Sequence, residues 1–331
     1  MDCKRFDACA LAARLARIRV LYTDLDGTVL GPRGNLLVDG RGRPSAATAE
    51  TIVRLNRCDA IDVMPVTGRS VTQLIELARI CGWSNFIAEA GAVLSYYDPA
   101  RGVRTNHYNL PEWPADTLNS GRHEVGTASA VPTGAGVAGL PVGAGRTPLE
   151  IIAATGAFQR LQAAFPGQVE YHSPWNVNRQ ATDVLRGRLP YTQATALLAD
   201  ITPALALVEN GVIAPKAHTL TAGQGPIRAY HLTPAGATKA SAIAADLAQR
   251  GLTRDQAMMI GDGRADLECA TAVDFVVMVE NALSSPGLPD SIAAVDNAYV
   301  VDGCAGDGWV RVATALLDAT PDATPDEKGR A

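Results

Sequence analysis

The stretch Leu21–Val29 reads Leu-Tyr-Thr-Asp-Leu-Asp-Gly-Thr-Val, and it decides the expected fold. The segment that leads into it, Ile18–Tyr22, is predominantly apolar, has β-branched residues and contains no breaker, which is typical of a buried parallel strand. Two carboxylates, Asp24 and Asp26, follow at the end of this strand. Open α/β sheets carry their chemistry at the carboxyl ends of strands, so we predict an active site at this position.

Gly27 follows the two carboxylates and indicates that the chain turns there. Asp24 and Asp26 can then reach one pocket, where ionising both is costly. A divalent cation relieves that cost, as does a proton kept by one of the two acids. A turn with acidic residues is the simpler interpretation of Asp-Gly alone, but it accounts less well for Asp-x-Asp-Gly-Thr after an apolar strand.

The composition limits the class of protein. The chain has 331 residues, of which 47% are hydrophobic and 19% are charged, and its net charge is -5. This length predicts two domains. We find no basic stripe for nucleic acid and no apolar run long enough to span a membrane, so the expected partner is a small molecule. The six cysteines lack metal-ligand spacing, which favours reduced thiols in a cytoplasmic protein. Met1–Arg19 is expected to form an amphipathic helix rather than a signal peptide.

A second apolar strand, Ile61–Val66, ends at Thr67, Gly68 and Arg69. A hydroxyl, a glycine and a cation at a strand end suit an anion, because the backbone can approach closely and arginine can bind phosphate oxygens in a bidentate way. Taken alone, this stretch is equally consistent with the start of a helix.

Two later segments carry further charged residues. Lys239 lies near the start of a predicted helix, where the macrodipole does not favour a cation, so the lysine is expected to face anions. The apolar strand Gln256–Ile260 is followed by Asp262 and Asp266. Two carboxylates four residues apart, with glycines beside the first, can hold a hard cation and leave room for a ligand.

Taken in order, these four stretches resemble the four signatures of the haloacid dehalogenase superfamily, whose phosphatase branch begins with Asp-x-Asp-Gly-Thr. Glu89-Ala90-Gly91-Ala92 resembles the Glu-Asn-Gly-Ala stretch of the Cof-type branch, although Ala90 stands where that branch has Asn. Ala265 also replaces an Asn of that branch. Asn281 matches a later Gly-Asn-Ala stretch.

The resemblance implies an α/β fold: a Rossmann-like doubly wound parallel sheet with an inserted α+β cap of the C2 type. The expected catalytic core comprises residues 1–104 and 229–319, and the expected cap comprises residues 105–228. Residues 320–331 are predicted to form a disordered tail. Within this scheme Ala229–Leu232 is a core strand, and Ile151–Phe165 is a single helix.

The resemblance also implies a phosphatase mechanism. Asp24 would attack the phosphate monoester and form an aspartyl-phosphate, and Asp26 would protonate the leaving alcohol and then activate water. Thr67 and Lys239 would hold the transferring oxygens. Mg²⁺ is the implied cofactor, and its implied ligands are Asp24, the backbone carbonyl of Asp26, Asp262 and, directly or in the outer shell, Asp266.

The cap is expected to recognise the leaving group. Trp175, Asn176, Asn178 and Arg179 suit a polyol, sugar or phosphoglycerate-type ester, because an aromatic face lies among hydrogen-bonding groups in the sequence. In the competing interpretation, Trp175 lies in the core and the polar residues cap a turn. The other candidate substrate-binding residues are Gly27, Gly68, Arg69 and Asn281.

Two alternatives use the same residues. A phosphomutase would form the same aspartyl-phosphate but return the phosphoryl group to substrate, so release of inorganic phosphate distinguishes the two. A regulatory protein would keep the phosphate pocket without turnover, and the substitutions at Ala90 and Ala265 leave that alternative open. A dehalogenase is disfavoured, since that branch does not need Asp26.

Overall fold

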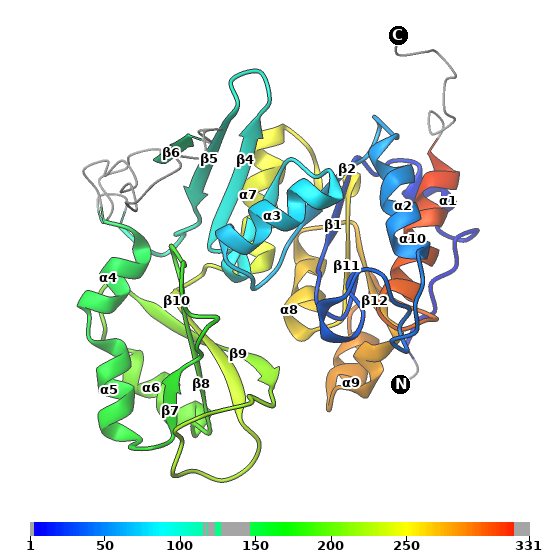
Figure 1. The fold of residues 1–331 in the computed structure, drawn as a ribbon. Coiled ribbons are helices and arrows are strands. Elements are labelled where there is room, and N and C mark those ends of the chain that lie inside the picture. Colours follow the sequence, from blue (N-terminus) through cyan, green and yellow to red (C-terminus); the bar gives the residue numbers. More distant parts are fainter. Residues whose placement is uncertain (1–2, 115–116, 118–122, 127–145, 321–331) are drawn as a thin grey trace. The chain divides into compact units, whose positions relative to one another are not determined.

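The computed structural model describes residues 3–114, 117, 123–126 and 146–320, and the predicted tail after residue 320 lies outside them. The chain divides into two compact units, which are described separately (Figure 1). The first unit comprises Met1–Thr67, Glu76–Ile87 and Thr238–Ala331, and the second comprises Gly68–Ile75 and Ala88–Ala237. Among the described residues, no helix combines the length and the apolar character that crossing a bilayer requires.

A five-stranded parallel sheet forms the centre of the first unit. Every residue of its three middle strands is buried, as expected for a parallel sheet covered on both faces. The predicted apolar strands are therefore confirmed, with bounds that differ by a residue or so. The strands lie in the order β13 (Ala298–Val301), β12 (Phe275–Val279), β11 (Ala257–Gly261), β1 (Val20–Thr23) and β2 (Asp62–Pro65).

Helices cover both faces of this sheet, which confirms the doubly wound fold. Figure 1 shows α2 (Ala47–Asn56) and α10 (Gly306–Ala319) on one side and α8 (Arg264–Leu267) on the other. α8 packs against β11 and β12, and also against α7 (Lys239–Arg250). The remaining helices of this part of the chain are α1 (Ala12–Leu15), α3 (Val71–Cys81), which crosses the boundary between the units, and α9 (Leu288–Ala293).

The strand order reverses between β1 and β11. From β1 the chain continues to β2 on one side, and from β11 it continues to β12 on the other. In open α/β sheets, ligands bind beyond the carboxyl ends of the strands at such a switch point. Because β1 ends at Thr23 and β11 ends at Gly261, Asp24 and Asp262 leave adjacent strands at this edge.

The helix predicted over Met1–Arg19 is wrong for most of its length, since only α1 is helical there. The residues before α1 extend along β13 instead. The Phe6 N–H donates to the Val300 carbonyl at 2.8 Å, and the Val300 N–H donates to the Lys4 carbonyl at 2.8 Å. The edge strand β13 offers unpaired backbone groups, and satisfying them outweighs the helical tendency of this short segment.

The second unit contains an antiparallel sheet in the order β7 (Val169–Tyr171), β8 (Asp183–Gly187), β10 (Arg228–Pro234) and β9 (Leu205–Val212). Its apolar core includes Phe158, Leu161, Leu185 and Tyr230. The helices of this unit are α4 (Pro148–Ala154), α5 (Ala157–Ala164) and α6 (Tyr191–Leu198). β3 (Phe86–Ala88) leads into a further antiparallel set, β4 (Val93–Asp98), β5 (Val103–Tyr108) and β6 (His123–Gly126).

Two predictions about this region are wrong. Ala229–Leu232 is not a core strand, because β10 pairs with β8 and β9 in the antiparallel sheet. Ile151–Phe165 is not one helix, because the chain breaks at Gly156, which has a φ of 70°. The predicted cap, residues 105–228, falls inside a unit that begins at Ala88 and continues to Ala237.

The backbone of Glu89 and Ala90 is left-handed, with φ angles of 53° and 59°. Such angles are uncommon outside glycine and asparagine. The φ of Ala90 therefore gives a physical reason for the Asn that the resembling family stretch has at this position.

Replacing Ala90 with Asn should raise the free energy of unfolding by about 0.5–1 kcal/mol, because Asn tolerates the left-handed conformation better than Ala. Urea unfolding measures the change. Ala153→Asn is the matched control: Ala153 is exposed in α4, where Asn should lower stability by about 0.5 kcal/mol. If Ala90→Asn is no more stable than the wild type, strain at this residue is not the reason.

Candidate active site

Three buried or half-buried carboxylates meet at the switch point of the first unit. Asp24, Asp262 and Asp266 each offer an oxygen, and these oxygens all lie within 4.8 Å of one another. Asp24 and Asp262 directly follow β1 and β11, whereas Asp266 lies in α8. The Asp24 N–H donates to the Ile260 carbonyl at 2.9 Å, so sheet pairing places the end of β1 beside the end of β11.

Lys239 joins two of these acids. Its Nζ lies 2.7 Å from Asp24 Oδ1 and 2.7 Å from Asp266 Oδ1. Lys239 is the first residue of α7, whose N-terminus is capped by the Thr238 hydroxyl, which accepts from the Ser241 N–H. The lysine side chain is 9% exposed and faces anions. Most lysines are exposed to solvent, whereas the side chain of Lys239 is buried.

Asp266 is fully occupied by protein donors. One of its oxygens accepts from Lys239, and the other accepts from the N–H groups of Asp262 (3.1 Å) and Gly263 (2.9 Å). A Cβ on Gly261 would lie 2.2 Å from the Asp266 Cβ, so only glycine fits there. These contacts make Asp266 a residue that holds the loop and the lysine, and they leave Asp262 to face a ligand.

The turn after β1 is held by Asn281. The Asn281 Nδ2 donates to the Gly27 carbonyl at 3.0 Å and to Asp262 Oδ2 at 2.9 Å, and the Asn281 Oδ1 accepts from the Ala305 N–H at 2.8 Å. Gly27 has a φ of 85°, and a Cβ there would lie 2.3 Å from Asp262 Oδ2. These contacts favour a positioning role for Asn281 and Gly27 over the predicted contact with substrate. Asp26 lies in the same turn and is exposed.

The sequence does not predict a second set of hydrogen bonds, which holds the backbone of Asp24. The indole N–H of Trp309 donates to the Thr23 hydroxyl at 3.0 Å, and that hydroxyl donates to the Asp24 carbonyl at 2.9 Å. Trp309 and Thr23 are fully buried and are 286 residues apart. The only local signal was a hydroxyl residue at the end of an apolar strand. The Thr28 hydroxyl also lies 3.4 Å from Asp24 Oδ2.

The carboxylates of Asp24, Asp262 and Asp266 repel one another when they are ionised. Three ionised carboxylates and one ammonium leave a net charge of −2 in a buried site. Burial raises the pKa of Asp24 to about 7, although Lys239 opposes the rise. Burial, together with the charges of Asp24 and Asp266, raises the pKa of Asp262 to about 8. A divalent cation would balance this charge, and a set of carboxylate oxygens is the donor chemistry that Mg²⁺ prefers.

The predicted anion-binding stretch is divided between the two units. Thr67 is buried at the end of β2, beside β1, and its N–H donates to the Ile87 carbonyl at 3.0 Å. Gly68 and Arg69 belong to the second unit. There the Gly68 carbonyl accepts from Arg179 at 2.9 Å, and the Arg69 carbonyl accepts from the Glu89 N–H at 2.9 Å.

The predicted leaving-group residues lie in the second unit and differ in exposure. Trp175 is 53% exposed, so the interpretation that puts it in the core is wrong. Asn178 is exposed and has a φ of 58°. Arg179 is buried, and its guanidinium binds groups of the protein, which favours a positioning role over the predicted substrate contact.

Comparisons with known proteins agree with this site. Residues 213–285, which include Lys239, Asp262 and Asp266, match the haloacid dehalogenase-like hydrolase family. No curated protein matches the chain. The family match agrees, over the residues that it covers, with the resemblance to the haloacid dehalogenase superfamily.

Solved structures share the fold over nearly the whole chain. A Thermoplasma acidophilum protein is 15% identical, with a TM-score of 0.56 over 90% of this chain and 98% of that one. A haloacid dehalogenase-like hydrolase from Bacteroides thetaiotaomicron is 13% identical, with a TM-score of 0.52 over 90% and 99%. The sucrose-phosphatase of Synechocystis sp. is 15% identical, with a TM-score of 0.54 over 90% and 97%. At these identities the likeness is one of fold.

The raised pKa values of Asp24 and Asp262 predict a pH-dependent response to Mg²⁺. Both acids bind protons more tightly in the folded protein than in the unfolded chain, so without a cation their contribution to stability is present below about pH 4 and is lost as the pH rises to about 8. Mg²⁺ competes with these protons, so its stabilising effect should grow by about 1.4 kcal/mol per pH unit for each proton displaced between pH 6 and 8.

Thermal unfolding with Mg²⁺ and with a chelator at pH 6, 7 and 8 measures this response. Asp262→Asn should abolish most of the increase, because the cation then loses a carboxylate. Asp59→Asn, a change of an exposed acid in the first unit, should leave it intact. A stabilisation by Mg²⁺ that is the same at all three pH values would contradict the assignment of this cluster as the cation site.

Proposed function

We propose that this haloacid dehalogenase-like hydrolase is a Mg²⁺-dependent phosphomonoester hydrolase that acts through an aspartyl-phosphate. The observation that carries the proposal is the contact of Lys239 with Asp24 in a cluster with Asp262 and Asp266, at the sheet edge where such folds bind ligands. The cluster combines a carboxylate nucleophile, a fixed positive charge and oxygen ligands for a cation. Each of the three can lower the barrier to phosphoryl transfer from a dianionic ester.

Asp24 is the proposed nucleophile. The Asp24 carboxylate attacks phosphorus, and Lys239, at 2.7 Å from its Oδ1, stays close enough to neutralise charge on the transferring oxygens. Trp309 and Thr23 hold the Asp24 backbone, so that the attacking oxygen keeps its direction. The hydroxyl of Thr67, at the neighbouring strand end, is the proposed second donor to the phosphoryl oxygens.

Asp26 is the proposed general acid and base. Asp26 lies two residues after the nucleophile, in the turn that follows β1. It is exposed, whereas Asp24 is buried, and such a difference in environment is what two roles for two acids require. Asp26 gives its proton to the leaving alcohol and then accepts one from the water that hydrolyses the aspartyl-phosphate.

Asp24, the Asp26 carbonyl and Asp262 would hold Mg²⁺, and Asp266, whose oxygens accept from Lys239 and from two backbone N–H groups, would support this set. When bound, this ion supplies Lewis-acid stabilisation of the phosphoryl oxygens and offsets the repulsion between the Asp24 carboxylate and the ester. The residues of the chain perform every proton transfer.

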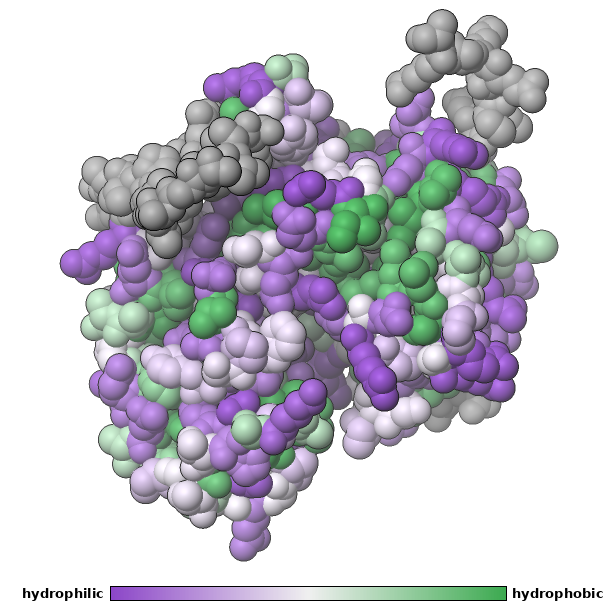
Figure 2. Space-filling model, in the orientation of Figure 1, coloured by the Kyte–Doolittle hydropathy of each residue, from purple (hydrophilic) through white to green (hydrophobic). Residues whose placement is uncertain are grey.

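The proposed substrate is a sugar phosphate, a polyol phosphate or a phosphoglycerate-type ester, all of which have a leaving group rich in hydroxyls. On the face of the second unit that Figure 2 shows, hydrophilic and intermediate residues predominate among those that are coloured, and hydrophobic ones form small groups. Trp175 is one of the few large apolar side chains exposed there. Trp175 and Asn178 are both exposed and lie three residues apart, and an indole together with an amide suits the alternating apolar and hydroxyl faces of a sugar. The similar fold of a sucrose-phosphatase solved with sucrose and phosphate adds support.

Phosphate release from a panel of phosphomonoesters, with Mg²⁺ and with a chelator, tests the proposal. Asp24→Asn should abolish release, because the amide cannot attack phosphorus. Asp26→Asn should slow alkyl esters by about 10²–10⁴-fold and affect an ester with a good leaving group much less, because that group departs without a proton. Asp59→Asn serves as the control.

The outcomes separate the functions. Mg²⁺-dependent release that is lost in Asp24→Asn supports the phosphatase, and the order of the esters identifies the leaving group. Full turnover of an alkyl phosphate by Asp26→Asn would remove its assigned role. Transfer of the phosphoryl group between positions of a sugar without release would instead identify a mutase, and the absence of any reaction would favour a regulatory protein.

A further inference from the structure

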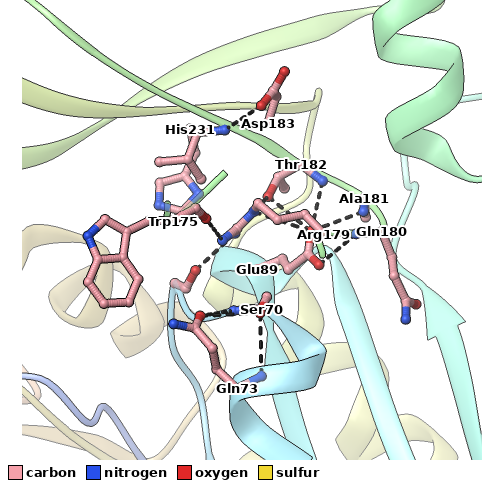
Figure 3. A network of polar contacts seen from close by, with 12 residues as sticks. Ser70, Gln73, Glu89, Trp175, Arg179, Gln180, Ala181, Thr182, Asp183 and His231 are labelled. Atoms are coloured by element: carbon pink, nitrogen blue, oxygen red, sulfur yellow. Dashed lines mark hydrogen bonds and ion pairs between the residues drawn. The ribbon is translucent and has the colours of Figure 1, made fainter. Parts of the chain in front are cut away.

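Glu89 is a fully buried carboxylate with an unusual number of donors. Its side chain accepts the N–H groups of Gln180 (2.8 Å), Ala181 (3.0 Å) and Thr182 (2.9 Å), and it also accepts the Thr182 hydroxyl at 3.1 Å (Figure 3). Arg179 Nε lies 3.7 Å from the same carboxylate. Hydrogen bonds to an ionised group are the stronger kind, so this carboxylate fixes the backbone of residues 180–182.

Arg179 binds three separate parts of the second unit. Its guanidinium donates to the Thr182 hydroxyl at 2.8 Å, to the Trp175 carbonyl at 3.4 Å and to the Gly68 carbonyl at 2.9 Å. The side chain is 2% exposed. A planar fork with several donors can span these acceptors, whereas a lysine ammonium cannot match their directions.

The turn after Thr67 is held from the other side by the backbone of Glu89. The Glu89 N–H donates to the Arg69 carbonyl at 2.9 Å, and its φ of 53° is a left-handed angle that is costly for a residue with a long side chain. A Cβ on Gly68 would lie 3.2 Å from His231 Nε2, so a side chain there would require the His231 ring to shift. Successive residues of this turn are thus fastened to Glu89 and to Arg179.

These contacts are costly to maintain. A buried ion pair gains little over apolar packing, and removing one partner leaves an uncompensated charge. The strained angle of Glu89 adds to that cost. A network of this kind is retained most readily where it fixes a geometry that function needs, and here it connects the segment Trp175–Thr182 to the turn after Thr67 (Figure 3).

We propose that Glu89 and Arg179 are positioning residues that couple recognition of the leaving group to the phosphate-binding turn. This inference rests on the proposed function. A leaving group that contacts Trp175 fixes the conformation of the segment Trp175–Thr182. The hydrogen bond from Arg179 then fixes the Gly68 carbonyl and, with it, the position of the preceding residue, Thr67. A ligand with a minimal leaving group, or with none, gains nothing from Trp175 and depends only on the resting position of the turn, which Arg179 and Glu89 also hold. Arg179 and Glu89 contact neither the phosphate nor the leaving group.

The test compares four sites by kinetics. Glu89→Gln and Arg179→Met each remove one partner of the pair, and Arg179→Lys keeps the charge without the fork. Trp175→Ala removes only the surface that meets the leaving group. Glu170→Gln is the matched control, because Glu170 also binds an arginine (Arg186, 2.6 Å) and a backbone N–H in the same unit. The readouts are the ratio of kcat/KM for the preferred ester to that for methyl phosphate, and the inhibition constant of inorganic phosphate.

We expect Trp175→Ala to lower the ratio of kcat/KM about 10-fold and to leave phosphate inhibition unchanged. Glu89→Gln and Arg179→Met should lower that ratio and also weaken phosphate inhibition, each by about 10-fold, and the double variant should be no worse than either. Arg179→Lys should restore neither the ratio of kcat/KM nor the inhibition by phosphate, because lysine lacks the planar fork. Glu170→Gln should change neither readout.

Three results would overturn the coupling. Unchanged phosphate inhibition in Glu89→Gln would mean that the network only stabilises the second unit locally and does not act on the phosphate-binding turn. Additive effects of Glu89→Gln and Arg179→Met would mean that the two act separately. Rescue by Arg179→Lys would mean that Arg179 meets the substrate as a charge.

Hydrogen exchange tests the same coupling without turnover. In Glu89→Gln, exchange should accelerate in the peptides that cover residues 68–75 and 175–182 together, and acceleration confined to 175–182 would overturn the proposal. If Glu89→Gln does not fold, Arg179→Lys serves, with the same two outcomes. A wild-type protein that releases no phosphate would refute the proposed function, whereas the exchange result would still decide whether the two segments are coupled.

Discussion

The structure of the first unit depends on the burial of excess negative charge at one edge of a parallel sheet. Asp24, Asp262 and Asp266 lie within a few ångströms of one another, and Lys239 neutralises only one of the three charges. Burial raises the pKa values of Asp24 and Asp262, which means that the folded chain favours a proton or a cation there. The surrounding contacts keep these acids in place despite their repulsion: Asp266 holds the lysine, and Asn281 holds the turn.

The second unit uses buried charge differently. In the first unit an excess of negative charge is left for a ligand to balance, whereas Glu89 and Arg179 balance each other and are surrounded by donors and acceptors. The acidic cluster of the first unit suits a reaction on an anion with a bound cation. The Glu89–Arg179 pair of the second unit suits the positioning of the backbone segments that it joins. A charged pair held at the left-handed turn of Glu89 fixes the residue after Thr67, and this is how recognition in the second unit would influence the phosphate site.

The sequence predicted the parallel sheet and the acids at its edge, because apolar strands and the polar residues that end them are local patterns. Asp24 and Asp262 follow such strands, whereas the expectation that Lys239 faces anions depends on its place at the start of a helix and on the resemblance. The sequence did not predict contacts made by residues far apart, such as Trp309 with Thr23 or Glu89 with residues 180–182. β10 was assigned to the wrong sheet, since an apolar strand gives no sign of its partners. Arg179 was read as a substrate ligand because burial is not visible in sequence.

Asp24 is the residue that we propose carries the phosphoryl group during the reaction. The most direct measurement is mass spectrometry of the protein after acid quenching during turnover of the best ester, with peptide mapping of the added phosphoryl group. We expect a phosphorylated peptide that contains Asp24. It should decay when the ester is exhausted, and it should accumulate in Asp26→Asn with an ester whose leaving group needs no proton. Phosphate release without a phosphorylated Asp24 at any time point, or modification of a different residue, would contradict this proposal.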